Sequence, residues 1–312
     1  MLIFNPGASV GNSARFQRWG GTPFALGENA AYLRWRDAKL TDYPVSADAL
    51  LVEIKDAADV SPPEHARIRE ICARTNMVLF HDASERLTDR KLFRSFAAEF
   101  GLKHLSPHML ADSDGIASIT PTSEQEIKGE YIPYTTRALN WHTDGYYGTG
   151  GETIKGFALY CLRAAMNGGE SAMIDPEIIY IRLRDQNPEH IAAFCRPDAM
   201  TIPANMQGDV EIRPESTGPV FSTDPQTGQL AMRYTARTVS IAWPDDDQMT
   251  AARSALDNIL ASAAVFNYTL GPGDGLLCNN VLHGRSAFND PDRLIYRGRY
   301  LDRVSDPSIE AE

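Results

Sequence analysis

Hydrophobic residues recur at helical spacing in two segments of the first third of the chain. The first opens with a capping box from Ser61 to Glu64, with proline at the first helical positions, and its later apolar residues share one face. The second begins near Thr88, presents apolar residues on one face and stops at Gly101. The apolar run 77–80 between them has the length of a buried strand. This part of the chain therefore predicts a helix, a strand and a second helix.

Short strand-like segments dominate the rest of the chain. They are expected at 157–162, 171–174, 200–243, 266–282 and 293–302. Helices with capping or acidic first turns are expected among them, after Asp175, Asn187 and Pro244. The pattern predicts a mostly β protein with flanking helices, built as a double-stranded β-helix, the jelly-roll barrel, whose open mouth can carry a strand-borne site.

Composition is that of a single soluble domain. The chain shows no internal repeat, low-complexity tract or linker, so residues 1–312 are expected to form one unit. Residues 1–60 are expected to be an irregular N-terminal wrap and residues 61–303 the core. Hydrophobic content of 43% and charged content of 23% are typical of globular proteins. No membrane span is expected, because no run of about 18 apolar residues occurs.

Charge and cysteine usage narrow the partners. A net charge of −11 and a pI near 5.1 argue against nucleic acid and anionic membranes, because a basic footprint is missing. The four cysteines lie apart in apolar stretches, which indicates a reducing compartment. The start of the chain lacks a signal-peptide pattern, so a cytoplasmic protein is expected. The expected partner is a small molecule, and the formation of a homo-oligomer is left as a possibility.

Two histidines and a carboxylate carry the candidate chemistry. His142 and Asp144 form a His-x-Asp motif, and in an extended strand such residues point to the same face and can bind one metal together. His283 would complete the ligand set of a non-haem Fe(II) site, which leaves three coordination positions open. The arginine cluster that begins at Arg293 is suited to hold a dicarboxylate co-substrate beside the metal.

Each motif is weak by itself, because a lone His-x-Asp is also typical of a surface turn. Two other classes use the same residues. A zinc hydrolase is disfavoured because the chain lacks a His-Glu-x-x-His spacing with its general base. The second class is a non-enzymatic, cupin-like binding protein. In that class the presence of Arg293 and Ser171 at their positions would be a coincidence.

Five segments, in the same order, resemble the taurine dioxygenase-like (TauD/TfdA) superfamily of Fe(II)/2-oxoglutarate oxygenases, which includes the γ-butyrobetaine and trimethyllysine hydroxylases. They are the His-x-Asp segment 140–144, a Gly-Gly-x-Ser turn with a following aspartate at 168–175, the turn 271–274, the distal histidine segment 279–288 and the arginine strand 292–297. The resemblance covers residues 61–303, and the stretch from His142 to Arg184 is more similar to the γ-butyrobetaine branch.

The resemblance implies a set of site residues and cofactors. His142, Asp144 and His283 would bind Fe(II), and 2-oxoglutarate and O2 would be the co-substrates. The far carboxylate of 2-oxoglutarate would pair with a guanidinium fork and accept a hydrogen bond from a serine hydroxyl. Arg293 and Ser171 occupy these positions.

Arg297 shares the strand face of Arg293 and could hold either 2-oxoglutarate or an anionic group of the main substrate. Relatives differ in the spacing after the distal histidine, so the two arginines can exchange roles. A mobile lid over the site is expected at the glycine-rich segment 148–151.

Further residues bear on the substrate. Ser106 stands where taurine dioxygenase has a sulfonate-binding histidine, so taurine is not expected. Tyr146 and Tyr147 could form an aromatic wall or ordinary packing, and Arg237 could face an anion or solvent. The sequence thus predicts an Fe(II)/2-oxoglutarate-dependent dioxygenase that hydroxylates a small anionic or zwitterionic metabolite and releases succinate and CO2.

Overall fold

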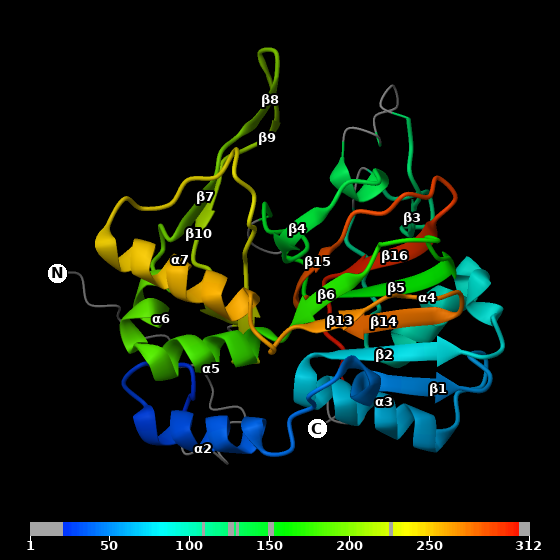
Figure 1. The fold of residues 1–312 in the computed structure, drawn as a ribbon, viewed down its shortest axis with the longest axis horizontal. Helices are drawn as coiled ribbons and strands as arrows, with labels where there is room; N and C mark the ends of the chain where they lie inside the picture. Colours follow the sequence, from blue (N-terminus) through cyan, green and yellow to red (C-terminus); the bar gives the residue numbers. More distant parts are fainter. Residues whose placement is uncertain are drawn as a thin grey trace.

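Two β-sheets that face one another form the centre of the molecule, with helices on either side (Figure 1). This computed structural model describes residues 21–107, 110–123, 128, 131–148, 153–224 and 227–305. A sheet-rich fold with few helices was predicted, and it is confirmed. The described strands do not close into a barrel.

The larger sheet has six strands. In spatial order they are β1 (Leu51–Ile54), β2 (Met77–Asp82), β14 (Asp274–Cys278), β5 (Gly156–Arg163), β16 (Leu294–Tyr300) and β3 (Ala117–Ile119). The β1–β2 pair is parallel and every other pair is antiparallel. Its outer face is covered by α3 (Pro62–Thr75) and α4 (Arg90–Glu99). Phe93 and Phe96 of α4 pack against Tyr160 and Phe80 of the sheet.

The smaller sheet is antiparallel and has four strands. Their order is β13 (Phe266–Tyr268), β6 (Ser171–Ile174), β15 (Leu282–Arg285) and β4 (Leu139–His142). Its inner face meets the six-stranded sheet, because the rings of Phe157 on β5 and His283 on β15 have centroids 4.7 Å apart. Side chains from both sheets therefore meet in one interior.

A second hydrophobic core lies to one side of the sheets. Helices α2 (Asn29–Leu40), α5 (Pro176–Gln186), α6 (Pro188–Phe194) and α7 (Asp247–Leu260) gather there (Figure 1). The expected caps form, since the side chains of Asp175, Asn187 and Asp246 accept hydrogen bonds from the first turns of α5, α6 and α7. The sequence prediction of these three helices is confirmed.

Short ribbons and single-turn helices complete the described fold. The ribbons pair β7 (Met200–Ile202) with β10 (Ser216–Gly218), β11 (Phe221–Thr223) with β12 (Leu230–Met232), and β8 (Asn205–Gln207) with β9 (Val210–Arg213). The β8–β9 hairpin extends away from the body above the second core (Figure 1). The 3-10 helices are η1 (Ala47–Leu50), η2 (Arg86–Thr88) and η4 (Ile132–Tyr134).

The N-terminal part is more regular than the sequence suggested. Residues 1–60 were expected to be irregular, but this range contains α2 and β1, while residues 1–20 lie outside the described part. Lys39 of α2 is buried, and its Nζ lies 2.7 Å from Asp175 Oδ2 and 2.5 Å from Glu177 Oε2 at the start of α5. This ion pair ties α2 to the second core. None of the described helices has the length and apolarity that crossing a membrane requires.

Candidate metal centre

Strand pairing places His142 beside His283. His142 ends β4, and its antiparallel partner in β15 is His283. Their ring centroids are 4.3 Å apart. Asp144 lies two residues beyond β4, in a turn, so the extended-strand geometry predicted for the His-x-Asp motif is wrong. The turn nevertheless brings the carboxylate to both rings.

The three side chains present converging ligand atoms. One nitrogen of each imidazole and one oxygen of Asp144 lie within 4.8 Å of one another, and His142 Nε2 is 3.6 Å from Asp144 Oδ1. Each Nδ1 is 2.9 Å from a backbone carbonyl two residues earlier, that of Asn140 for His142 and that of Val281 for His283. An Nδ1–H that donates to a carbonyl leaves the Nε2 lone pair free for a metal.

Electrostatics keep His283 and Asp144 in the protonation states that bind metals. Burial, reinforced by the neighbouring His142, lowers the pKa of His283 to about 3, so its ring is neutral near pH 7. Burial alone would raise the pKa of Asp144, but the charges of Arg299 and Arg297 outweigh it and hold that pKa well below its usual range. The arrangement therefore offers two imidazole rings and one carboxylate anion, the donor set that suits Fe(II).

Asn280 clamps the turn that carries Asp144. Its backbone φ is 52°, in the left-handed region that asparagine tolerates. The side-chain oxygen of Asn280 accepts a hydrogen bond from the Asp144 backbone N–H at 2.7 Å. The side-chain amide of Asn280 donates to the carbonyls of Asp144 at 2.9 Å and Ile154 at 2.8 Å. The sequence prediction gave Asn280 no role. The one local signal was an asparagine in a turn just before the distal histidine.

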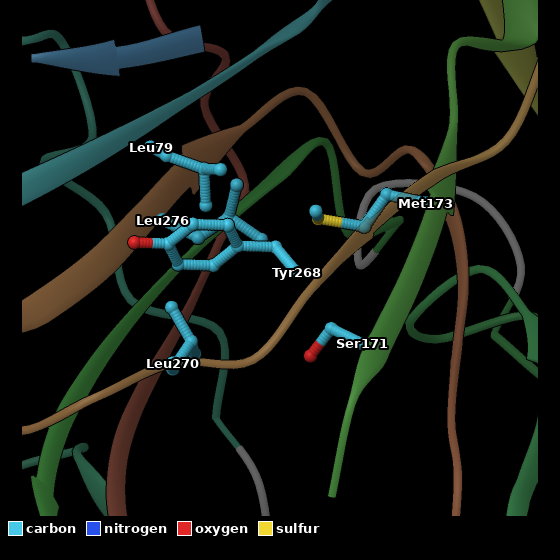
Figure 2. A pocket seen from close by; sticks show the side chains of 6 residues that line it. All are labelled: Leu79, Ser171, Met173, Tyr268, Leu270 and Leu276. Atoms are coloured by element: carbon cyan, nitrogen blue, oxygen red, sulfur yellow. The ribbon is translucent and has the colours of Figure 1, made fainter. Parts of the chain in front are cut away.

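Ser171 is the first residue of β6 and pairs with Arg285 of β15. Its side chain is directed into a crevice between the two sheets, as Figure 2 shows; the crevice is otherwise lined by Leu79, Met173, Tyr268, Leu270 and Leu276. In the described part of the chain, the Ser171 hydroxyl has no hydrogen-bond partner. Ser171 thus offers a free donor in an apolar wall.

Two buried arginines flank the ring of Phe288. The guanidinium carbons of Arg285 and Arg293 lie 4.6 and 5.1 Å from its centroid. Arg285 donates to carbonyls of the loop 133–137, whereas Arg293 has no hydrogen-bond or ion-pair partner among the described residues. A Cβ added at Gly169, in the Gly-Gly turn, would lie 3.4 Å from Arg293 Nε. The free donors of Arg293 are therefore next to the turn that precedes Ser171.

Arg297 and Arg299 extend from β16 towards Asp144. Arg299 donates from Nε and Nη2 to the two oxygens of Asp144 at 2.8 and 3.0 Å. Arg297 Nη1 lies 4.0 Å from Asp144 Oδ1, and its buried Nε is unpaired among the described residues. Arg299 is therefore not available as a free cation for the substrate, because the carboxylate of Asp144 neutralises it.

Tyr146 and Tyr147 lie directly beside the candidate ligands. The Tyr146 ring is edge-on to His142 at 6.4 Å and to Tyr147 at 5.3 Å, and the Tyr147 hydroxyl accepts a hydrogen bond from Arg299 Nη1 at 3.1 Å. Arg237 donates to the Tyr146 hydroxyl at 3.4 Å. The structure therefore brings these three sequence candidates to the metal centre.

Ser106 and the expected lid are less informative. The Ser106 backbone N–H donates to the Arg299 carbonyl at 2.8 Å, which places Ser106 next to β16. The Ser106 hydroxyl makes a long contact of 3.5 Å with the Pro107 carbonyl. Of the glycine-rich segment 148–151, residues 149–151 lie outside the described part of the chain.

The model of the taurine catabolism dioxygenase TauD, TfdA family matches residues 36–299. The chain belongs to this family. The match includes the His-x-Asp turn, the Gly-Gly turn, the distal histidine and most of the arginine strand. It confirms the resemblance to this dioxygenase family that the five segments indicated. The narrower likeness to the γ-butyrobetaine branch stays a prediction.

Two relatives are uridine-5'-phosphate dioxygenases. One, from an Amycolatopsis species, is 32% identical over 177 residues, which make up 54% of this chain and 62% of that protein. The other, from a Streptomyces species, is 27% identical over 241 residues, or 72% of this chain and 85% of that protein. The first match thus spans less than two thirds of its relative.

Solved structures share the fold. An asparagine oxygenase in complex with Fe(II), 3-hydroxyasparagine and succinate has a TM-score of 0.54 at 15% identity, covering 76% of this chain and 78% of that one. The non-haem iron oxygenase OrfP, in complex with Fe and 2-oxoglutarate, has a TM-score of 0.57 at 17% identity, covering 82% and 83%. At this identity the likeness concerns the fold.

Proposed function

We propose that this protein is an Fe(II)/2-oxoglutarate-dependent dioxygenase in which His142, Asp144 and His283 bind the metal. The observation that carries the proposal is the convergence of three ligand atoms within 4.8 Å of one another, with both Nδ1 atoms facing carbonyls. Bound Fe(II) would supply the oxidative decarboxylation of 2-oxoglutarate by O2 and the hydroxylation of a substrate carbon. The protein orients the three ligands and excludes water around them.

We place the far carboxylate of 2-oxoglutarate at Arg293 and Ser171. Arg293 is a buried cation whose donors face no described acceptor, and Ser171 presents an unused hydroxyl nearby. A buried cation without an anion is costly, so a carboxylate fits there. Arg297 Nη1 lies 4.0 Å from Asp144 Oδ1, which supports a role of Arg297 towards the main substrate.

Apolar side chains would shield the reaction from water. The Phe157 ring packs against the His283 ring at a tilt of 46°. Met173 on β6 faces Leu276 on β14 across the crevice between the sheets (Figure 2). A dry interior strengthens each electrostatic contact to bound 2-oxoglutarate. The two facing sheets support the proposal that the fold is a double-stranded β-helix within one domain, and we also propose a cytoplasmic location.

The relatives suggest a substrate. Uridine 5'-phosphate is named as the substrate of two relatives, and it is a small anion, as the sequence analysis expected. We therefore propose uridine 5'-phosphate or a similar small phosphorylated metabolite as the substrate to test first.

The test combines metal content with product formation. His142→Ala, Asp144→Ala and His283→Ala should each lose bound iron and succinate formation, because a three-ligand site has no spare protein ligand. His104→Ala, which removes an exposed histidine paired with Asp302, is the matched control and should keep both. Iron binding without substrate-stimulated succinate would favour a binding protein, and activity with zinc alone would favour a hydrolase.

A further inference from the structure

Three arginines from two segments of the chain lie on the side of Tyr146 and Tyr147. Arg213 ends the β8–β9 hairpin, and its guanidinium carbon lies 6.0 Å from the centroid of the Tyr147 ring. Arg237 follows β12 and reaches the Tyr146 hydroxyl. Arg233, four residues before Arg237, interacts electrostatically with Arg213. Such a concentration of cations is notable in a chain whose net charge is −11.

Arg233 has a structural task. Its guanidinium donates to the carbonyls of Tyr146, Met200 and Ser216, at 2.7 to 2.9 Å, and to the Ser216 hydroxyl at 3.0 Å. These contacts hold the turn that contains Tyr146 against the β7–β10 ribbon. They leave Arg233 few donors for a ligand, but its positive charge still acts on the neighbouring space.

Arg213 and Arg237 keep donors available. Arg213 bonds two carbonyls, of Pro203 and Pro214, and Arg237 makes one long hydrogen bond of 3.4 Å to the Tyr146 hydroxyl. Neither arginine has an ion-pair partner among the described residues. Burial and then the charge of Arg237 act to lower the pKa of Arg213, a sign that the two cations lie close together without a compensating carboxylate.

The tyrosines connect this pair to the metal centre. The Tyr146 ring contacts the His142 ring, and the Tyr147 hydroxyl bonds to Arg299, which holds Asp144. A substrate group bound by Arg213 and Arg237 would thus be separated from the candidate metal-binding residues by one layer of aromatic side chains. This placement suits a substrate that carries its anionic group at one end.

We propose that Arg213 and Arg237 form the subsite for the phosphate group of a phosphate-monoester substrate, beside Tyr146 and Tyr147. This inference rests on the proposed dioxygenase function and names the substrate class of that same site. A phosphate monoester carries close to two negative charges and three terminal oxygens, so it can pair with two guanidinium groups from different segments at once. One carboxylate has half that charge and would leave one cation uncompensated.

Equilibrium binding on the full chain tests the subsite. We would titrate uridine 5'-phosphate, uridine and inorganic phosphate calorimetrically into metal-free protein and into protein loaded anaerobically with Fe(II) and 2-oxoglutarate. Uridine 5'-phosphate should bind at least about tenfold more tightly than uridine, since a charge-assisted hydrogen bond contributes that much. Arg237→Ala should remove most of this difference and leave iron and 2-oxoglutarate binding unchanged.

Arg213→Lys is the second variant, because alanine at this position would also release the hairpin carbonyls. Arg182→Ala, which removes an exposed arginine of α5 bonded to Ser262, is the charge-matched control and should bind like the wild type. Equal binding of uridine and uridine 5'-phosphate, or wild-type discrimination in Arg237→Ala, would overturn the phosphate subsite. If the wild-type protein bound no iron or no 2-oxoglutarate, the proposed dioxygenase function would be refuted. The titrations of metal-free protein would still show whether the phosphate subsite exists.

Discussion

Arg299 grips the carboxylate of Asp144 with two hydrogen bonds, Nε to Oδ2 at 2.8 Å and Nη2 to Oδ1 at 3.0 Å. Arg299 belongs to the six-stranded sheet, whereas Asp144 follows a strand of the smaller sheet. The pair therefore joins the two sheets at the metal centre. It also fixes the plane of the carboxylate and supplies a positive charge where a metal ion would otherwise be the main counter-charge.

Removal of this guanidinium should destabilise the metal-free protein most. In Arg299→Ala the buried carboxylate of Asp144 loses its partner, which costs about 3–5 kcal/mol for a buried pair. A bound divalent ion restores a counter-charge, so the loss should be smaller in protein loaded with Mn(II). Urea unfolding of both forms measures this, with Arg182→Ala as control. An equal loss in both forms would show that Asp144 does not meet the metal.

Asn280 is expected to position Asp144 through its backbone. Asn280→Ala removes three hydrogen bonds and puts alanine, which tolerates the left-handed region less well than asparagine, at a φ of 52°; this should destabilise the protein by roughly 2–4 kcal/mol. Asn280→Gly removes the same bonds without the backbone strain, so it should be the milder of the two by about 1 kcal/mol. Both should weaken metal binding, as measured by metal titration. Metal affinity equal to that of the wild type would assign Asn280 a purely structural role.

Steady-state kinetics can distinguish whether Arg293 or Arg297 binds 2-oxoglutarate. Arg293→Ala should raise the KM for 2-oxoglutarate more than a hundredfold, because one partner of a buried bidentate pair is lost. Arg297→Ala should act mainly on the KM of the main substrate. Initial rates of succinate formation at varied concentrations of each substrate give both constants. The reverse pattern would show that Arg297, and not Arg293, holds 2-oxoglutarate.

Low pH should weaken the interaction between Arg90 and Asp114. Arg90 donates from Nε and Nη2 to Asp114 at 2.6 and 2.7 Å, and these bonds hold the pKa of Asp114 below its usual value. The ionised carboxylate therefore stabilises the fold above pH about 4, and this contribution disappears as the pH falls through the lowered pKa. Urea unfolding should show Asp114→Asn less stable than the wild type at pH 6, with the gap narrowing towards pH 3. A gap that stays constant with pH would contradict this.

Local patterns were enough for much of the secondary structure. The capping box at Ser61, the aspartate and asparagine caps before Pro176 and Pro188, and the apolar run from Met77 each depend on neighbours within a few residues. Helix α2 and strand β1 are exceptions. The apolar residues of α2 do not form a clear stripe, and the helix is held by contacts such as that of Lys39 with Asp175, which lies far along the chain.

The sequence by itself determined which residue types could bind a metal and in which order they occur. Only the tertiary structure decided that Asp144 sits in a turn clamped by Asn280, that Arg299 is neutralised, and that Arg293 keeps free donors. These outcomes depend on the register of strands more than 100 residues apart and on how two sheets pack face to face. Periodicity carries no information about such pairings, because it reports only which face of its own element a side chain occupies.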